Sequence, residues 1–271
     1  KKIANALNVI GLINVQFAVA GSTVYVIEAN PRASRTVPFV AKATGVQLVK
    51  VASRVMLGAT LVQLRQEGLL PERVSGGHVS VKEAVLPFNR FAEVDTALGP
   101  EMRSTGEVMG IDDSFARAFA KAQFAAGTTL PESGLVFVSL NDRDKSGGVE
   151  VVKGLSSLGL QIAATSGTAK YLTENGCVVT RVVSKFSERK TPDKNFDDAV
   201  KLIEAGEIVL VINTPHGYGT RTDGEAIRKS ANNCRVSVVT TLSAAQAAVQ
   251  GMIEQRNRPF TVKSLQEFHA R

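Results

Sequence analysis

The sequence predicts an α/β protein built from two segments, the second of which forms a doubly wound parallel sheet. From residue 135 onward, apolar strand-like runs alternate with helical stretches, a pattern typical of parallel strands covered by helices. Near the start, two apolar runs flank Gly21-Ser22, which is a hairpin signal. A stretch rich in Thr, Pro, Ser and Gly over 128–134 reads as a linker. We therefore expect segments 1–127 and 128–271.

The first segment begins with the hairpin and continues mainly as helices. Side-chain alternation indicates its strands, and apolar residues at helical spacing, closed by Gly58 and Gly68, indicate its helices. Pro38 is compatible with a first helical turn, where its missing N–H costs little. The expected elements are strands over 12–19, 25–30 and 79–85, and helices over 37–43, 46–57, 61–67 and 115–124.

The second segment repeats a strand and a helix five times. Short apolar runs indicate buried strands, and Gly176 ends one of the helices between them. The expected strands are 135–140, 161–165, 177–183, 208–213 and 236–240, and the expected helices are 148–158, 168–175, 196–205, 224–232 and 243–255. Ligands of such sheets bind at the carboxyl ends of the strands.

The composition and charge of the chain indicate which kinds of ligand it can bind. The 271 residues carry a formal charge of +7, which favours anionic ligands. Three Tyr, no Trp and scattered basic residues argue against nucleic acid, so small phosphorylated ligands fit better. No apolar stretch is long enough for a membrane span. Cys177 and Cys234 lack metal-ligand spacing, and we expect buried free thiols in a reducing cytoplasm.

The most informative motif is the strand that ends in Glu28-Ala29-Asn30-Pro31-Arg32. Glu28 and Asn30 are two apart, so they share a face of the strand, and the hairpin sets Gln16 opposite Glu28 or one residue away. Oxygen ligands beside the guanidinium of Arg32 suit Mg²⁺ and a polyphosphate together. A half-buried hairpin with solvated charges explains the same residues equally well, so both interpretations stay open.

A second group of polar residues follows the strands of the parallel sheet. The start of the helix after Thr165 offers free N–H groups and the helix dipole to an anion. Taken alone, Thr165 to Thr168 is more simply a plain N-cap, and each lysine a solvated surface residue. Their convergence on one sheet edge favours a phosphate site. The candidate residues are Ser139, Lys145, Thr165, Ser166, Gly167, Thr168, Lys185 and Asn213.

Longer stretches of the chain resemble a known family. Gln16 with residues 28–35 is similar to the metal and ATP end of an ATP-grasp domain, and residues 36–46, 82–88 and 99–110 resemble the carbamoyl-phosphate synthase large chain. The resemblance implies the C-terminal part of a longer chain, whose first segment is the end of an ATP-grasp domain. It implies MgATP-dependent phosphorylation of carbamate to carbamoyl phosphate by the complete protein, and it implies that the 271 residues alone are inactive because they lack the nucleotide-clamping part of the ATP-grasp fold.

The resemblance also implies roles for individual residues of the first segment. Gln16, Glu28 and Asn30 would hold two Mg²⁺ or Mn²⁺ ions, with K⁺ as a further ion. Gln16 and Glu28 would also contact ATP, while Arg32 and Arg35 would steady the transferring phosphoryl group. A glutaminase small chain, an oligomer of heterodimers, a cytoplasmic location, and a place in arginine and pyrimidine biosynthesis are the further implications.

The second segment resembles the methylglyoxal-synthase-like domain of that family. This implies an allosteric site for UMP or IMP, lined by the eight candidate residues named above. Pro215, Ser166 and Tyr218 depart from the family pattern, which leaves the choice of nucleotide open. Glu83 and Thr240, followed by Thr241, match positions associated with ornithine.

Two alternatives to the synthase remain. One is a stand-alone nucleotide-sensing module, in which the ATP-grasp part is structural. The other is a lyase acting on a triose phosphate, which needs a carboxylate base beside the phosphate. The residues directly after Asn213 include no acid, which argues against this alternative, and Asp223 in the following loop is the only acid near that strand end to test.

Overall fold

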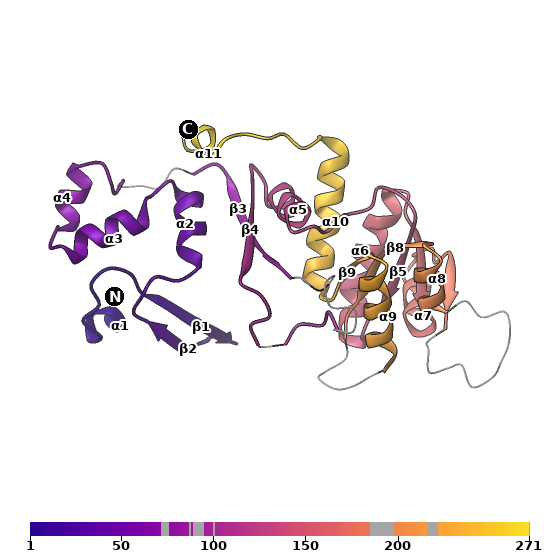
Figure 1. Ribbon diagram of the computed structural model, residues 1–271. Coiled ribbons are helices and arrows are strands. Elements are labelled where there is room, and N and C mark those ends of the chain that lie inside the picture. Colours follow the sequence, from indigo (N-terminus) through magenta and orange to yellow (C-terminus); the bar gives the residue numbers. More distant parts are fainter. Residues whose placement is uncertain are drawn as a thin grey trace. The chain divides into compact units, whose positions relative to one another are not determined.

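The structure is a computed structural model that describes residues 1–71, 76–86, 88, 95–99, 101–184, 198–215 and 222–270. The chain forms two compact units (Figure 1). We call Lys1–His78 with Thr261–Arg271 the hairpin unit, and Val79–Phe260 the sheet unit.

The hairpin unit takes its name from strands β1 (Asn14–Ala20) and β2 (Thr23–Asn30), which pair antiparallel. Ala20 pairs with Thr23, so Gly21 and Ser22 form a two-residue turn, and Gly21 has the positive φ of 60° that such turns need. The hairpin is therefore confirmed. The helices are α1 (Lys2–Ala6), α2 (Thr36–Thr44), α3 (Leu48–Met56), α4 (Leu61–Gln66) and α11 (Leu265–His269).

The core of the hairpin unit is small and lies among its helices. Val46, Val51 and Leu64 form it. The last helix, α11, returns from the far end of the sequence and buries Phe268, whose ring lies edge-on to His78 at 5.8 Å between centroids. The ring nitrogen Nε2 of His78 bonds the carbonyl oxygen of Ala43 at 2.8 Å. Two distant parts of the chain thus close this unit.

The sheet unit contains a five-stranded parallel sheet in the order β7-β6-β5-β8-β9. The predicted strands and helices are all found, with ends shifted by a few residues where they are described. The strands are β5 (Leu135–Ser139), β6 (Gln161–Thr165), β7 (Arg181–Val183), β8 (Ile208–Asn213) and β9 (Ser237–Val239). The helices are α6 (Lys145–Ser157), α7 (Ser166–Glu174), α8 (Ala199–Glu204), α9 (Thr222–Asn233) and α10 (Leu242–Asn257).

Helices cover both faces of this sheet, as a doubly wound fold requires. On one face, α6, α7 and α10 pack Leu155, Leu172 and Val249 against strand residues. On the other face, α8 and α9 contribute Ile203 and Ile227. The predicted α/β class is confirmed. Both cysteines are free, but only Cys177 is buried; the expectation of burial is wrong for Cys234, which is exposed after the end of α9.

A second, antiparallel pair belongs to the sheet unit by its contacts. Strands β3 (Val79–Val85) and β4 (Gly106–Asp112) pair, and α5 (Phe115–Ala125) packs on both of them and on α10 (Figure 1). The compact units therefore divide the chain near residue 78, whereas the predicted segments meet at 127/128. That segment boundary stays a prediction.

Candidate functional site

The predicted oxygen ligands come together on the hairpin. Gln16 lies directly opposite Glu28 in the strand register, and Asn14 lies opposite Asn30. A register shift follows Gln16, so the pairing beyond it is offset by one residue. The amide nitrogen Nδ2 of Asn30 donates to Glu28 Oε1 at 2.8 Å, which confirms that these two side chains share a face. The sequence-based geometry of Gln16, Glu28 and Asn30 is therefore confirmed; their role as ligands is a separate matter.

The chemistry of these side chains suits a hard cation only after one adjustment. Glu28 offers a carboxylate and Gln16 an amide oxygen, which are ligands that Mg²⁺ and Mn²⁺ accept. Asn30 turns its nitrogen toward Glu28, so its amide must rotate before its oxygen joins the same ion. No group of three or more His, Cys, Asp or Glu that could hold a metal occurs in the described ranges. The predicted set contains a single carboxylate and two amides, so it is a different kind of site.

The two predicted arginines follow the strand end. The guanidinium of Arg32 donates from Nη1 to the carbonyl of Ala33 at 3.2 Å and is exposed. Arg35 occupies the N-cap position of α2. Ser34, between them, accepts hydrogen bonds from the Thr36 amide at 3.3 Å and from the Asn14 amide side chain at 3.4 Å. These bonds tie the turn after β2 to the start of β1.

The second candidate site lies at the carboxyl edge of the parallel sheet. Ser139 and Asn213 are paired across β5 and β8. Thr165, at the end of β6, donates its hydroxyl toward Thr168 Oγ1 at 3.2 Å and Ser139 Oγ at 3.5 Å. The predicted convergence of these residues on one edge is therefore observed.

Lys145 also reaches this edge. Its ammonium lies 3.8 Å from the point where a Cβ on Gly167 would stand, so it hangs over the first turn of α7. It also pairs with Asp142 Oδ1 at 2.7 Å, and Asp142 is itself almost fully exposed. A cation from the first residue of α6 thus meets a helix N-terminus after β6, an arrangement that favours an anion.

The turn at Thr165 is not a plain N-cap. Thr165 stands at the N-cap position of α7, but its side chain makes no capping hydrogen bond. Thr168 is 1% exposed, and its hydroxyl oxygen accepts the amide of Leu140 at 3.1 Å. Thr168 therefore joins the ends of β5 and β6, whereas Ser166 and Gly167 face solvent. Lys185, Tyr218 and His216 lie outside the described residues.

A pocket of about 890 Å³ opens beside this edge. Thr240 and Thr241, which follow β9, line it, whereas Glu83 is not among its lining residues. Glu83 lies on β3. Burial raises its pKa above the ordinary value, and hydrogen bonds from the Ala84 amide and the Gln123 side chain, which lower the pKa, only partly offset this. The described contacts do not join Glu83 to Thr240.

Sequence reasoning missed the charged residues of this pocket. Asp95, Arg103, Arg143 and Arg228 line it together with the two threonines. Asp95 and Arg228 are 133 positions apart, and neither belongs to a motif, so no local signal marked them. Their mutual contacts are short and are described below.

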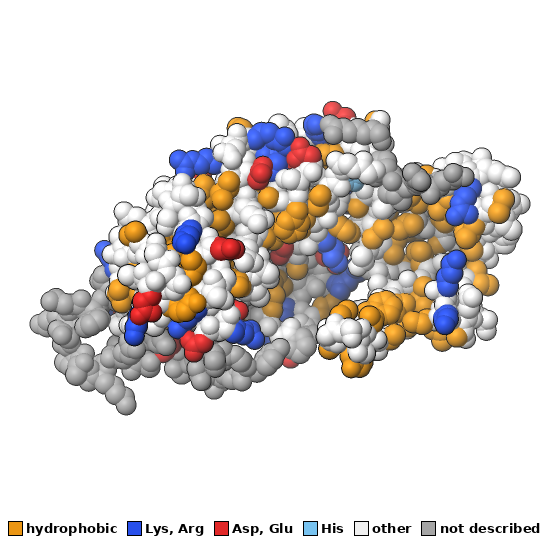
Figure 2. Space-filling model, turned by 180° about the vertical axis from the view of Figure 1, so that it is seen from behind, with side chains coloured by type: hydrophobic (Ala, Val, Ile, Leu, Met, Phe, Trp, Pro, Cys, Tyr) orange, Lys and Arg blue, Asp and Glu red, His pale blue; other side chains and the backbone are white. Residues whose placement is uncertain are grey.

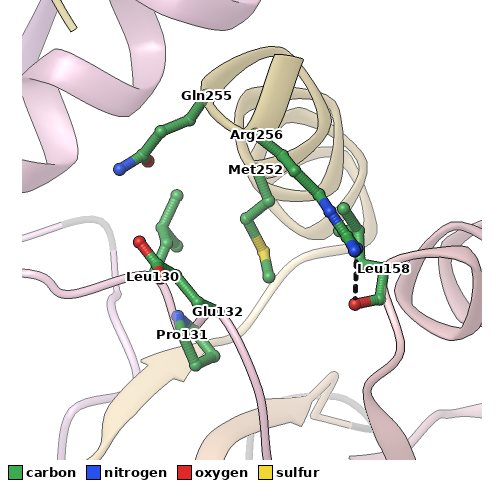
Figure 3. A pocket seen from close by; sticks show the side chains of 7 residues that line it. All are labelled: Leu130, Pro131, Glu132, Leu158, Met252, Gln255 and Arg256. Carbon is green, nitrogen blue, oxygen red and sulfur yellow. Dashed lines mark hydrogen bonds between the residues drawn. The ribbon is translucent and has the colours of Figure 1, made fainter. Parts of the chain in front are cut away.

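A smaller pocket of about 370 Å³ lies between the 130–132 segment and the last turns of α10 (Figure 3). Met252 projects into it from α10, while Arg256 donates to the carbonyl of Leu158 at 2.8 Å and caps the end of α6 (Figure 3). The polar side chains that line it are Glu132, Gln255 and Arg256. None of the predicted site residues lines it.

Both regions match known protein families. Residues 1–64 match the carbamoyl-phosphate synthase L chain, ATP binding domain, and residues 147–240 match the MGS-like domain. Over 269 residues the chain is 48% identical to the carbamoyl phosphate synthase large chain of Synechocystis, covering 99% of this chain and 24% of that one. The chain belongs to the carbamoyl phosphate synthase large-chain family. The predicted resemblance is confirmed.

Other large chains of the family agree. That of Mycobacterium tuberculosis is 50% identical over 279 residues, covering 98% of this chain and 25% of its own length. That of Rhodopirellula baltica is 48% identical and covers 100% of this chain and 24% of its own length. The present chain thus spans about a quarter of the curated large chains it matches. None of the helices in the described ranges has the length and apolarity to cross a membrane.

Proposed function

We propose that this chain supplies metal and ATP ligands for the phosphorylation of carbamate within a complete carbamoyl phosphate synthase. The observation that carries this is the register of the hairpin, which sets Gln16 against Glu28 and Asn30 beside Glu28, inside a segment that matches an ATP-binding family. Gln16 and Glu28 would hold Mg²⁺ or Mn²⁺ and touch ATP, and Asn30 would complete the metal shell. K⁺ would be a further ion.

The chain's own contribution is binding and orientation. In phosphoryl transfer the bound metal ions neutralise the developing charge. Glu28 would fix their position, and its hydrogen bond from Asn30 limits where its carboxylate points. Arg32 and Arg35 follow the strand end and would steady the phosphoryl oxygens, because a guanidinium matches phosphate with two parallel donors.

Glu28→Gln in a complete large chain is the direct test, because it preserves the side-chain shape and removes one charge from the metal shell. We expect loss of carbamoyl phosphate synthesis and of Mn²⁺ binding, measured by product formation and by manganese electron paramagnetic resonance. Glu174→Gln is the matched control, since Glu174 is an exposed partner of Lys170 on α7. Normal turnover and normal Mn²⁺ binding by Glu28→Gln would remove the metal assignment.

We further propose that the sheet unit is the regulatory part and binds a nucleoside monophosphate, UMP or IMP, at its carboxyl edge. The support is the convergence of Lys145, the first turn of α7, and the hydroxyls around Thr165 in a segment that matches the MGS-like family. Ser139, Ser166, Gly167, Asn213 and Lys185 would complete the site. The complete protein would work with a glutaminase small chain as an oligomer of heterodimers.

Calorimetric titration of the 271-residue chain tests the nucleotide site. UMP or IMP should bind, and uridine should bind poorly because it lacks the phosphate dianion. Thr168→Ala should weaken UMP binding by about 1.5–3 kcal/mol, or roughly ten- to hundredfold, through loss of a hydrogen bond to a charged group or of the turn that presents the phosphate donors. Thr180→Ala is the matched control, since Thr180 also accepts a strand amide, that of Ile162 at 3.3 Å, but before β7. Equal binding of uridine and UMP would place the phosphate site elsewhere.

An ornithine site at Glu83 and Thr240 is the third part of the proposal. Glu83→Ala should abolish the response of a complete synthase to ornithine and leave its response to nucleotide. The separation of Glu83 from the residues that line the Thr240 pocket makes Thr240→Ala a necessary companion variant. If only Thr240→Ala loses the ornithine response, Glu83 has a structural role on β3.

The lyase alternative has a simple assay. Asp223 lies in the first turn of α9, one residue before Gly224, whose position borders Asn213. Release of inorganic phosphate from dihydroxyacetone phosphate by the chain, abolished by Asp223→Asn, would support a lyase. Absence of phosphate release together with tight UMP binding would support the regulatory assignment.

A further inference from the structure

One buried arginine bridges the candidate nucleotide edge and the neighbouring pocket. Arg228, on α9, is 6% exposed. Its Nη1 donates to Asn213 Oδ1 at 2.7 Å, while Nε and Nη2 donate to the two carboxylate oxygens of Asp95 at 2.6 Å each. Asn213 ends β8 at the edge described above, and Asp95 lines the pocket of about 890 Å³. The guanidinium of Arg228 therefore bonds one residue of the nucleotide edge and one residue that lines the pocket.

The surroundings keep this bridge in one arrangement. Gly224, one turn before Arg228, leaves the room it needs, because a Cβ there would stand 2.9 Å from Arg228 Nη1 and 3.4 Å from Asn213 Oδ1. Asn232, one turn after Arg228, donates to the carbonyl of Phe88 at 2.9 Å. Helix α9 thus bonds Phe88 and Asp95, which lie between β3 and β4 in the sequence, and it bonds Asn213 at the nucleotide edge.

The charges of the bridge favour a fixed geometry. Burial raises the pKa of Asp95, but hydrogen bonds from Arg228 and from the Ala97 amide outweigh it and hold the pKa below its ordinary value. A bidentate guanidinium–carboxylate pair is more directional than a lysine pair. The side-chain oxygen of Asn213 accepts the hydrogen bond from Arg228. The group of Asn213 that remains for a ligand is its amide nitrogen, which is a hydrogen-bond donor.

We propose that Arg228 is a positioning residue that couples nucleotide binding at the carboxyl edge to the conformation of residues 95–99 and 101–105. The inference rests on the proposed nucleotide site and adds the route by which its occupancy reaches the neighbouring pocket. A nucleotide that engages Asn213 fixes the orientation of its amide, and Arg228 passes that restraint to both oxygens of Asp95. By linkage, a ligand in the pocket changes nucleotide affinity by the same factor.

The test measures UMP affinity and amide hydrogen exchange on the 271-residue chain. In the wild type, UMP should slow exchange in peptides covering 95–99 and 101–105. Arg228→Met should bind UMP about tenfold more weakly and lose that protection, whereas Arg228→Lys should restore part of both. Arg181→Met is the matched control, because Arg181 forms an exposed pair with Glu207 at the amino edge of the same sheet.

Asp95→Asn separates coupling from folding. It removes the charge of Asp95 and leaves the bond from Arg228 to Asn213 available, so UMP affinity should stay within about threefold while protection at 95–99 is lost. Protection that survives in Asp95→Asn, or wild-type UMP affinity in Arg228→Met, would overturn the coupling. No UMP binding by the wild type would overturn the nucleotide site itself, and binding without protection would overturn the coupling alone.

Discussion

The two units of this chain bury their apolar residues to very different extents. In the sheet unit, two clusters of eighteen and eleven buried residues lie on the two faces of the parallel sheet. In the described part of the hairpin unit, the corresponding cluster has three. Consecutive residues of β2, from Val24 to Ile27, each expose more than half of their surface, so both faces of the hairpin are uncovered. Figure 2 shows hydrophobic side chains gathered over this hairpin.

The same contrast holds for their ion pairs. In the sheet unit, Arg117 is 1% exposed; its Nε lies 3.2 Å from Asp112 Oδ2, and its other nitrogens donate to the carbonyls of Arg258 and Pro259 at 2.6 and 3.2 Å. In the hairpin unit, Arg54 and Glu67 form a well-aligned pair at 2.8 and 2.9 Å, but both side chains are about 40% exposed. Geometry alone therefore does not decide what an ion pair contributes; burial does.

The difference in buried apolar core indicates which unit can fold on its own. A doubly wound sheet covered on both faces closes its own core, whereas an isolated two-stranded hairpin is marginal in water. Exposed apolar surface of this kind marks a protein contact, and the large chains of the family are about four times as long as this one.

The largest effect should come from separating the units. A polypeptide of residues 79–260 should fold cooperatively, and one of residues 1–78 should not, because it has little core and lacks α11 with Phe268. Circular dichroism during urea titration measures this. A cooperative transition in the 1–78 polypeptide would break the comparison.

The next effect should come from Arg117→Met. Removing the guanidinium leaves the buried charge of Asp112 less well neutralised, and the backbone carbonyls after α10 lose their hydrogen-bond donor. The sheet unit should therefore lose about 3–5 kcal/mol of unfolding free energy. Urea midpoints of the 79–260 polypeptide report it. A loss below about 1 kcal/mol would mean that Lys121 and Arg258, whose side-chain nitrogens lie 2.8 and 3.4 Å from Asp112, compensate its charge without Arg117.

A smaller effect should appear in acid. Burial raises the pKa of Asp112, but hydrogen bonds from Lys121, the Asp113 amide and Arg117 outweigh it and lower the pKa to about 2. The folded pKa lies below the unfolded one, so this stability is present above pH 4 and is lost as the pH falls toward 2. The contribution of the Asp112 carboxylate to the unfolding free energy should be roughly 1–2 kcal/mol after solvent screening. Asp112→Asn should flatten the unfolding free energy between pH 4 and 2.

The smallest effect should come from Arg54→Met in the hairpin unit. Its partner Glu67 is solvated in both states, so the unfolding midpoint of the whole chain should move little, and less in 0.5 M NaCl. Urea unfolding of the whole chain at two salt concentrations measures this, with Arg117→Met measured in the same chain. A shift as large as that of Arg117→Met would contradict the assignment of stability to burial.

Much of this architecture was predictable from local patterns. Alternation and glycine position gave the hairpin and its register, and the repeated strand–helix pattern gave the parallel sheet, because each depends on neighbours in sequence. The convergence of Lys145 with Gly167 followed from sheet topology alone. The bridge of Arg228 to Asp95 could not be predicted in this way, since the two residues are 133 positions apart and no local pattern relates them.

Strand β4 shows why one element escaped prediction. Its sequence carries Gly106 and Gly110, and glycine weakens a strand signal. Gly110 is needed there because a Cβ would collide with the carbonyl oxygen of Ala118 and stand 2.6 Å from the amide of Ala122. Helix α5 crosses the strand at backbone contact, so the residue that hides the strand from prediction is the one that the packing requires.

The return of residues 261–271 to the hairpin unit imposes an order on synthesis. Phe268 and His269 close that unit, yet 182 residues of the sheet unit separate them from His78. At about 5–20 residues per second, a ribosome needs roughly 10–40 s to make that insertion. Throughout that interval the helical part of the hairpin unit lacks Phe268 and His269, while the sheet unit completes its own fold. The nascent segment 1–78 is therefore the stretch where a chaperone would be needed most.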